Sequence, residues 1–218
     1  MRTLKIATVL IAVTLTMTGC SEGESKGGNS SSQGGTDEPC DKVLNTQTKE
    51  AMKRIADIPE STETKFIGDL RRTADELVAQ HDSGTNNPNH DIEFCGAHRG
   101  SSGLPSVFVR FSLPEELPEQ GRVASIYKEY EMGKMALGGI KVGVLYFECS
   151  NGKFAADSRT TVLLRGEVRS RYDVTESEDA ARKDNLHIVY ESSRALSNLL
   201  DCNSNSGLTG SFKMPPEV

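Results

Sequence analysis

Apolar residues are distributed along the chain in three successive patterns. Residues 6–17 form a mostly apolar run without a charged residue, whereas residues 21–39 contain no apolar side chain apart from Pro39. From Cys40 onward, apolar residues recur every three or four positions in some stretches and every second position in others. Those intervals are the periods of amphipathic helices and half-buried strands, so only the third region has the pattern of a folded domain.

Two helices are predicted at the start of this domain. Residues 41–58 have apolar side chains at helical spacing, with Asn45 or Thr46 able to cap an internal break and Pro59 ending the segment, which predicts one broken helix. Residues 66–80 predict a second amphipathic helix. Its apolar stripe consists of Phe66, Ile67, Leu70, Ala74, Leu77 and Val78.

Strands are predicted in the middle of the domain, after a turn-rich loop over residues 81–89. The predicted strands are residues 91–95, 105–113, 122–139, 141–149 and 160–172. Within the second of these, Val107, Val109 and Phe111 are expected to face one way. The third also fits a helical pattern, and we favour a strand there. The Asn151-Gly152 step between the last two favours a hairpin.

The last helix has the strongest local signal. Thr175 followed by Glu178 matches a capping box and predicts a helix running to about Leu200. Its buried stripe is predicted to be Ile188, Val189, Ala195, Leu196, Leu199 and Leu200. Its polar face is predicted to carry His187, Glu191, Arg194 and Asn198. Residues 207–218 are expected to form a loose tail.

The order of these elements indicates the fold class. Helices, then antiparallel strands, then a long helix predict an α+β fold, an antiparallel sheet with helices packed on one face. Residues 40–218 are enough for one domain with a substantial core, and no stretch rich in Pro, Gly or Ser divides them. We therefore expect a single globular domain over residues 40–218.

The N-terminal residues have the three parts of a secretory signal. Arg2 and Lys5 precede the apolar run, and Thr18 and Gly19 supply small residues before Cys20. This arrangement resembles the lipobox of bacterial lipoproteins, with Met17 where Leu is commonest. The resemblance implies that residues 1–19 are removed and that Cys20 is the lipid attachment site, which would hold the chain on the extracytoplasmic face of the membrane.

Residues 20–39 are predicted to be a lipidated, Gly/Ser-rich tether. Their Ser, Gly, Asn, Gln and acidic residues cannot form a core. Random-coil scaling gives such a segment a mean reach of about 25 Å.

The other four cysteines predict disulfides. Cys40, Cys95, Cys149 and Cys202 are even in number, and an exported chain meets oxidising conditions. Four cysteines allow three pairings. We favour Cys40 with Cys95 and Cys149 with Cys202, each closing one half of the domain, while a Cys40–Cys202 bond stays open as the alternative.

The net negative charge of the chain limits the classes of partner that it can bind. The chain holds 25 basic and 31 acidic residues, a net charge of −6, and loss of Arg2 and Lys5 with the signal leaves 23 against 31, or −8. This acidic balance argues against nucleic-acid binding and against a basic patch on an anionic membrane.

No motif assigns a catalytic residue, a metal or a cofactor. The histidines His81, His90 and His98 with Cys95 could supply zinc ligands, but their spacing matches no familiar site, and we predict no metal. Residues 100–103 lack the frame of a nucleophile elbow. Glu115, Glu116 and Glu119 are interpreted as solvated loop residues. Tyr127, Tyr130, Met132 and Met135 are expected in the core rather than on a partner surface.

The order of cysteines, helices and strands also supports a family resemblance. The lipobox and the tether are followed by four predicted elements that contain the cysteines. These are a helix that begins at a cysteine, two strands that end at Cys95 and Cys149, and a helix that ends at Cys202. This order resembles the uncharacterised surface lipoproteins of actinobacteria, as do residues 145–149 and the Gly207-Leu208 pair after the last helix. The resemblance implies an exported chain with oxidised cysteines and no particular activity.

The sequence thus predicts a membrane-anchored extracytoplasmic lipoprotein. We expect a non-enzymatic module that binds a protein partner or a small ligand. One alternative is an envelope hydrolase with His90 or His98 as its base, and another is a structural envelope protein without a ligand.

Overall fold

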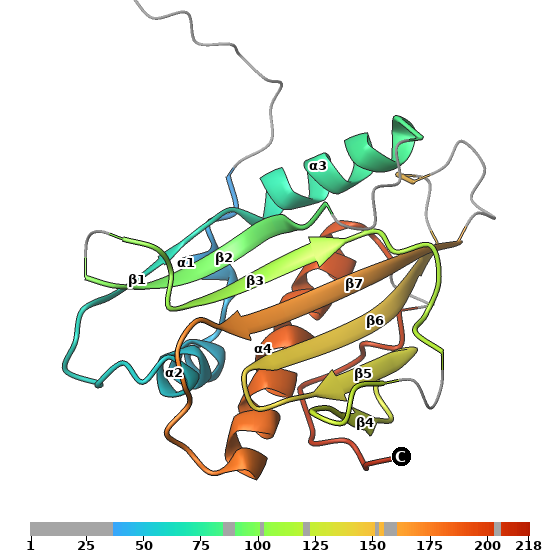
Figure 1. Cartoon of the computed structure of the whole chain (residues 1–218). Helices are drawn as coiled ribbons and strands as arrows, with labels where there is room; N and C mark the ends of the chain where they lie inside the picture. The colour runs from blue at the N-terminus through green and yellow to red at the C-terminus, as the bar shows by residue number, and fades with distance from the viewer. Residues whose placement is uncertain are drawn as a thin grey trace, which may run out of the picture. The chain divides into compact units, whose positions relative to one another are not determined.

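The computed structural model describes residues 37–84, 90–100, 103–119, 123–150, 153–154, 161–202 and 206–218, which all belong to the compact unit Gly35–Val218 (Figure 1). The predicted signal peptide, Cys20 and most of the predicted tether lie outside the described residues. The tether's last residues already contact the fold, because Leu70 N donates to Glu38 O at 2.9 Å and Arg71 forms an ion pair with Glu38.

A seven-stranded sheet forms the centre of this unit, in the order β1-β2-β3-β7-β6-β5-β4. Every neighbouring pair of strands is antiparallel. The strands are β1 Thr64–Ile67, β2 Ile92–Arg99, β3 Val107–Ser112, β4 Lys128–Tyr130, β5 Met135–Gly138, β6 Val142–Ser150 and β7 Thr161–Ser170. The predicted strands over residues 105–113, 141–149 and 160–172 are therefore confirmed, and the ambiguous stretch 122–139 contains the two strands β4 and β5.

The helices lie on one face of the sheet, which confirms the predicted α+β fold (Figure 1). They are α1 Cys40–Val43, α2 Thr46–Ile55, α3 Leu70–Asp82 and α4 Glu178–Leu199. Val107, Val109 and Phe111 share the buried face of β3, as the alternation predicts. These three side chains are fully buried and belong to the main hydrophobic core.

Two glycines allow α4 to cross the sheet closely. A Cβ on Gly143 of β6 would lie 2.9 Å from the backbone of Asn185, and one on Gly166 of β7 would lie 2.7 Å from Ser193 Oγ. Asn185 then donates to the carbonyls of Gly139 and Ile140 at 3.0 and 2.9 Å. Close backbone approach and these hydrogen bonds fix the position of α4 on the sheet.

The broken helix at the start of the domain is confirmed. Chain direction changes between α1 and α2, where Asn45 Oδ1 accepts from Thr48 N at 2.8 Å and caps α2. A side-chain oxygen at this position satisfies one of the otherwise unpaired N–H groups of the first turn, which is why Asn45 starts a new helix.

The second predicted helix begins later than expected. Phe66 and Ile67 belong to β1 and pair with Ala97 and Gly96 of β2, so placing them in a helix was wrong. Gly68 then adopts a φ of +144°, and Asp69 caps α3 by accepting from Arg72 N at 2.8 Å. Apolar spacing ran unbroken through this junction, because the last strand residues happen to continue the stripe of the helix.

The predicted capping box of the last helix was also wrong. Ser177 is the N-cap and accepts from Ala180 N at 3.4 Å, so Glu178 is the first helical residue rather than the third. Thr175 lies before the helix and donates instead to Asp57 Oδ1 at 3.2 Å. Thr175 and Ser177 each have a hydroxyl that could cap the helix. Thr175 is hydrogen-bonded to Asp57 instead, and Ser177 is the cap.

The loop that connects β6 and β7 is longer than the tight turn that the Asn151-Gly152 step predicted. These strands pair from Val142↔Arg169 to Ser150↔Thr161, so ten residues separate the last pair. Asn151 and Gly152, which predicted the hairpin, lie outside the described residues.

Residues 206–218, here called the strap, are not the loose tail that we expected. Leu208 is buried, and Tyr130 of β4 forms an isolated antiparallel bridge with Glu217. Glu131 N donates to Pro216 O at 3.1 Å, and Val218 N donates to Glu129 O at 3.0 Å. The strap has few apolar residues, but its backbone pairs with an edge strand, and apolar periodicity does not report such pairing.

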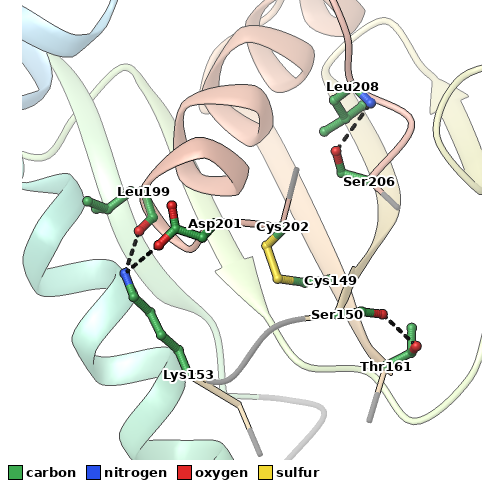
Figure 2. The surroundings of a disulfide bond; sticks show 9 residues. All are labelled: Cys149, Ser150, Lys153, Thr161, Leu199, Asp201, Cys202, Ser206 and Leu208. Atoms are coloured by element: carbon green, nitrogen blue, oxygen red, sulfur yellow. Dashed lines mark hydrogen bonds and ion pairs between the residues drawn. A yellow bond between two sulfur atoms is a disulfide. The ribbon is translucent and has the colours of Figure 1, made fainter. Parts of the chain in front are cut away.

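Two disulfides hold the unit in the favoured pairing. Cys40–Cys95 joins the start of α1 to β2, and Cys149–Cys202 joins the end of β6 to the residues after α4. All four cysteines are buried. Figure 2 shows Lys153 beside the second bond, where its Nζ donates to Leu199 O at 2.6 Å at the end of α4.

Candidate binding face on helix α4

The polar side of α4 is covered by the strap. Of the residues predicted there, Asn198 is exposed and His187 and Arg194 are half-buried, but Glu191 is only 7 % exposed. Burial of this carboxylate was not expected from the helical pattern. It arises because the strap crosses α4 at this point.

Ring contacts and hydrogen bonds from His187, Tyr190 and Glu191 fix the strap to α4. The Phe212 ring stacks on His187, with centroids 4.9 Å apart and an interplanar angle of 15°. Phe212 N donates to Glu191 Oε1 at 3.1 Å, and Tyr190 donates its hydroxyl to Thr209 O at 3.0 Å. These contacts with α4 add to the backbone pairing of the strap with β4.

A hollow lies on each side of the strap. The first, of about 650 Å³, is bounded by α2, α4 and the strap. The second, of about 760 Å³, is bounded by the turn between β4 and β5, Tyr190 and the strap. Ser211 lines both, so the strap runs between them. We call the surface of α2, α4, β4 and the β4–β5 turn that lies under the strap and around these two hollows the α4 face.

The first hollow is lined by charges of both signs. Arg54 makes two hydrogen bonds to Asp184, at 2.7 and 2.8 Å, and lies 3.7 Å from Glu176. The hydrogen bond with Asp184 raises the pKa of Arg54. Burial and then the charge of Asp184 raise the pKa of Glu176. Glu176 Oε2 is buried and has no hydrogen-bond partner within the described part of the chain.

The surroundings of His187 favour its uncharged form. Burial lowers its pKa, and the positive charges of Arg54 and Lys183 act in the same direction, against the raising effect of Glu191 and Asp184. Glu191 itself is held by Arg194, whose Nε and Nη2 lie 3.2 and 2.6 Å from the same carboxylate oxygen. The ring of His187 thus offers a flat, uncharged surface between charged neighbours.

This arrangement is suited to recognition. A neutral imidazole and a protonatable carboxyl are groups that acid–base catalysis uses. Across the described ranges, however, the His187 ring has no hydrogen bond to a hydroxyl or thiol that could act as a nucleophile. A flat ring and paired charges are groups that can orient a bound molecule.

The histidines singled out from the sequence are not brought together in a site. His81 lies against Phe154 and Asp82, His90 is exposed, and His98 Nδ1 lies 3.2 Å from Gly103 O. Cys95 is bonded to Cys40 and has no thiolate to offer a metal. Neither His90 nor His98 lines the hollows of the α4 face.

The other residues singled out from the sequence differ in how well their observed burial matches the prediction. Ser101 and Ser102 lie outside the described residues, and Glu115, Glu116 and Glu119 are exposed, as expected of solvated loop residues. Tyr130 and Met135 are buried, as predicted. Both also line the second hollow, together with Met132.

A second charged cluster occupies the sheet face opposite the helices. Glu167 on β7 is almost fully buried and is paired with Arg110, Arg165 and Arg169. Asp91 pairs with the first two of these arginines, at 3.1 and 3.4 Å. The alternation Arg165, Glu167, Arg169 places all three side chains on one face of β7, a period-two signal that sequence analysis missed.

Comparison of the chain with protein-family models, with curated proteins and with solved structures found no match. Over the described ranges, no helix has the length and apolar character needed to span a bilayer. Within the same ranges, no group of three or more His, Cys, Asp and Glu side chains is placed to bind a metal ion.

Proposed function

We propose that this chain is a lipid-anchored extracytoplasmic binding module that takes its ligand at the α4 face. In this proposal Cys20 carries the lipid, residues 21–36 connect it to the folded unit, and the unit binds a partner outside the membrane.

The proposed lipid anchor on Cys20 is supported by the order of residues 2–20. A charged start, an apolar run and the small residues Thr18 and Gly19 lead directly to Cys20. Disulfides between all four remaining cysteines support the same compartment, because such bonds persist mainly outside the cytosol. Likeness to actinobacterial surface lipoproteins forms part of this proposal and rests on the same features.

The proposed binding role is supported by the shape and charge of the α4 face. Its two hollows are large enough for a small ligand or several side chains of a partner, and they meet at the strap. Buried charge with defined partners is concentrated at Asp184 and Glu191, beside the half-buried ring of His187. Directional polar groups of this kind give a binding surface its specificity.

The anchor is tested by metabolic labelling with a fatty acid. The wild-type chain should take up the label and gain the mass of a diacylglyceryl group, whereas Cys20→Ala should do neither. Ser21→Ala is the matched control, since it changes the next residue but leaves the thiol, and it should label like the wild type. A wild-type chain that takes up no label would refute the proposed anchor.

A further inference from the structure

The strap contacts the rest of the unit in the way that a bound peptide contacts a receptor. β4 is the last strand of the sheet order, and its outer edge is paired with the strap through Pro216, Glu217 and Val218. Adding an extended segment to an exposed sheet edge is a recurrent mode of peptide recognition, in which backbone hydrogen bonds supply affinity.

Side chains of the strap add two anchor points. Phe212 occupies the space beside His187 and Tyr190, with ring centroids 4.9 and 5.7 Å away. Five residues further on, Glu217 accepts from Lys128 Nζ at 3.0 Å. An aromatic residue and a carboxylate at this spacing are therefore the features that the α4 face recognises in the strap.

Most residues of the strap are exposed, and few of them pack against the rest of the unit. Among its residues, Ser206 and Leu208 are buried, Phe212 and Pro215 are half-buried, and the others are exposed. Beyond Leu208, its attachment depends on the contacts of Thr209, Phe212 and the residues paired with β4. Few buried contacts and exposed hydrogen bonds are typical of segments that open at low free-energy cost.

Displacing the strap would join the two hollows. Ser211 lines both of them, and the strap is what separates them. The resulting groove would run from Arg54 on α2 and His187 on α4 to the edge of β4 that the strap now covers. It would be lined by the Glu191 carboxylate and the Tyr190 hydroxyl, which now bind the strap's backbone.

We propose that the α4 face is a peptide-binding groove, that the strap occupies it as an internal competitor, and that its partner is an extended segment of another protein with an aromatic residue and an acidic residue five positions later. This inference rests on the proposed binding function and specifies its ligand class. The partner's aromatic ring takes the place of Phe212 on His187, and its carboxylate takes the place of Glu217 at Lys128.

Competition by the strap has a quantitative consequence. A segment tethered next to its own site acts at an effective concentration of the order of millimolar, so a separate peptide binds weakly while the strap is intact. The apparent dissociation constant is the intrinsic constant divided by the fraction of chains whose groove is open. Weakening the strap must therefore tighten the binding of a peptide in trans.

The test is a fluorescence-anisotropy titration of the full chain with a labelled synthetic peptide of residues 207–218. Phe212→Ala in the chain should tighten binding of the wild-type peptide by about tenfold, the scale of one lost aromatic contact. Met214→Ala is the matched control, because Met214 is exposed and lines neither hollow, and it should bind like the wild type.

Three further variants, one of the chain and two of the peptide, distinguish loss of competition from misfolding. Glu217→Ala in the chain removes an exposed ion pair and should also tighten binding of the peptide, by a smaller factor. In the peptide, Phe212→Ala and Glu217→Ala should each weaken binding to the Phe212→Ala chain. These opposite effects of one substitution in the chain and in the peptide distinguish competition from damage to the fold.

Three outcomes would overturn the inference. The groove would be wrong if no chain variant bound the peptide, and the competition would be wrong if wild type and Phe212→Ala bound it equally. A wild-type dimer that Phe212→Ala dissociates would show that the strap is exchanged between copies of this chain instead. A Phe212→Ala chain that is labelled on Cys20 but binds no peptide would refute this inference while leaving the anchor intact.

Discussion

Glu167 is the side chain whose removal should cost the most stability for the smallest change in shape. Its carboxylate is 3 % exposed and lies 3.1 Å from Arg110 Nη2 and 2.9 Å from Arg169 Nε, with Arg165 as its third partner. Glu167→Gln keeps the size of the side chain and removes its charge. Arg110 and Arg165 would then keep Asp91 as a carboxylate partner, whereas Arg169 would lose its ion pair with Glu167.

The size of the effect follows from the burial of this cluster. Removing one partner of a buried ion pair typically costs about 3–5 kcal/mol, because the other charge stays buried without compensation. The arginines here are partly exposed and can reach water, so we expect the lower end, about 3 kcal/mol. For a domain of this size that corresponds to a fall in melting temperature of about 6–12 °C.

Equilibrium unfolding in urea without reducing agent measures the loss. Glu148→Gln is the matched control, because Glu148 lies on β6 and pairs with Lys134 at 3.0 Å but is 33 % exposed. Surface pairs of this kind contribute at most about 1 kcal/mol. Equal losses for Glu167→Gln and Glu148→Gln would refute the reasoning, since burial would then carry no penalty.

The same variant should alter the response to acid. Burial alone would raise the pKa of Glu167, but the hydrogen bond from Arg169 and the charges of Arg165, Arg169 and Arg110 outweigh it and lower the pKa. A carboxyl with a lowered folded-state pKa contributes stability that is present above its unfolded pKa and is lost as the pH falls through the folded value. Below about pH 4.5, the wild type should therefore lose unfolding free energy faster than Glu167→Gln.

Other features of the unit lead to comparable expectations. Replacing Cys149 and Cys202 together by Ala opens a loop with a sequence separation of 53 and should lower the free energy of unfolding by about 4 kcal/mol in urea titrations. A loss below about 1 kcal/mol would contradict that loop-closure argument. Because burial lowers the pKa of His187, the wild type should lose stability as the pH falls below about 6.5, where the unfolded chain binds the proton first. His187→Gln should flatten this dependence in thermal unfolding scans between neutral pH and pH 5, and an unchanged slope would show that other groups cause it.

Local sequence signals predicted the parts of the fold that local physics determines. Alternation placed Val107, Val109 and Phe111 on one buried face, and the even number of cysteines predicted two disulfides, which the structure contains in the favoured pairing. Asn45 could be recognised as a cap because its partner, Thr48, is three residues away. Each of these signals lies within a short stretch of chain or depends only on composition.

The α4 face could not be predicted in the same way. Arg54 and Asp184 lie 130 positions apart, and no periodicity connects them. The strap was interpreted as loose because its anchors are one aromatic ring and backbone groups, and the partner edge of β4 exists only in the folded sheet. Burial of Glu191 depends on Phe212, so it could not be inferred from the pattern of the helix alone.

The pairing of the cysteines has a consequence for how the chain reaches its oxidised state. Cys40 bonds to the next cysteine along the chain, Cys95, and Cys149 bonds to the next after it, Cys202, so neither loop crosses or encloses the other. If the chain is threaded across a membrane N-terminus first, its cysteines emerge in that same order. An oxidase that joins successive thiols as they emerge would form the native bonds directly, and no reshuffling of mispaired disulfides is needed. Acylation of Cys20 before then would also remove the one odd thiol that could compete.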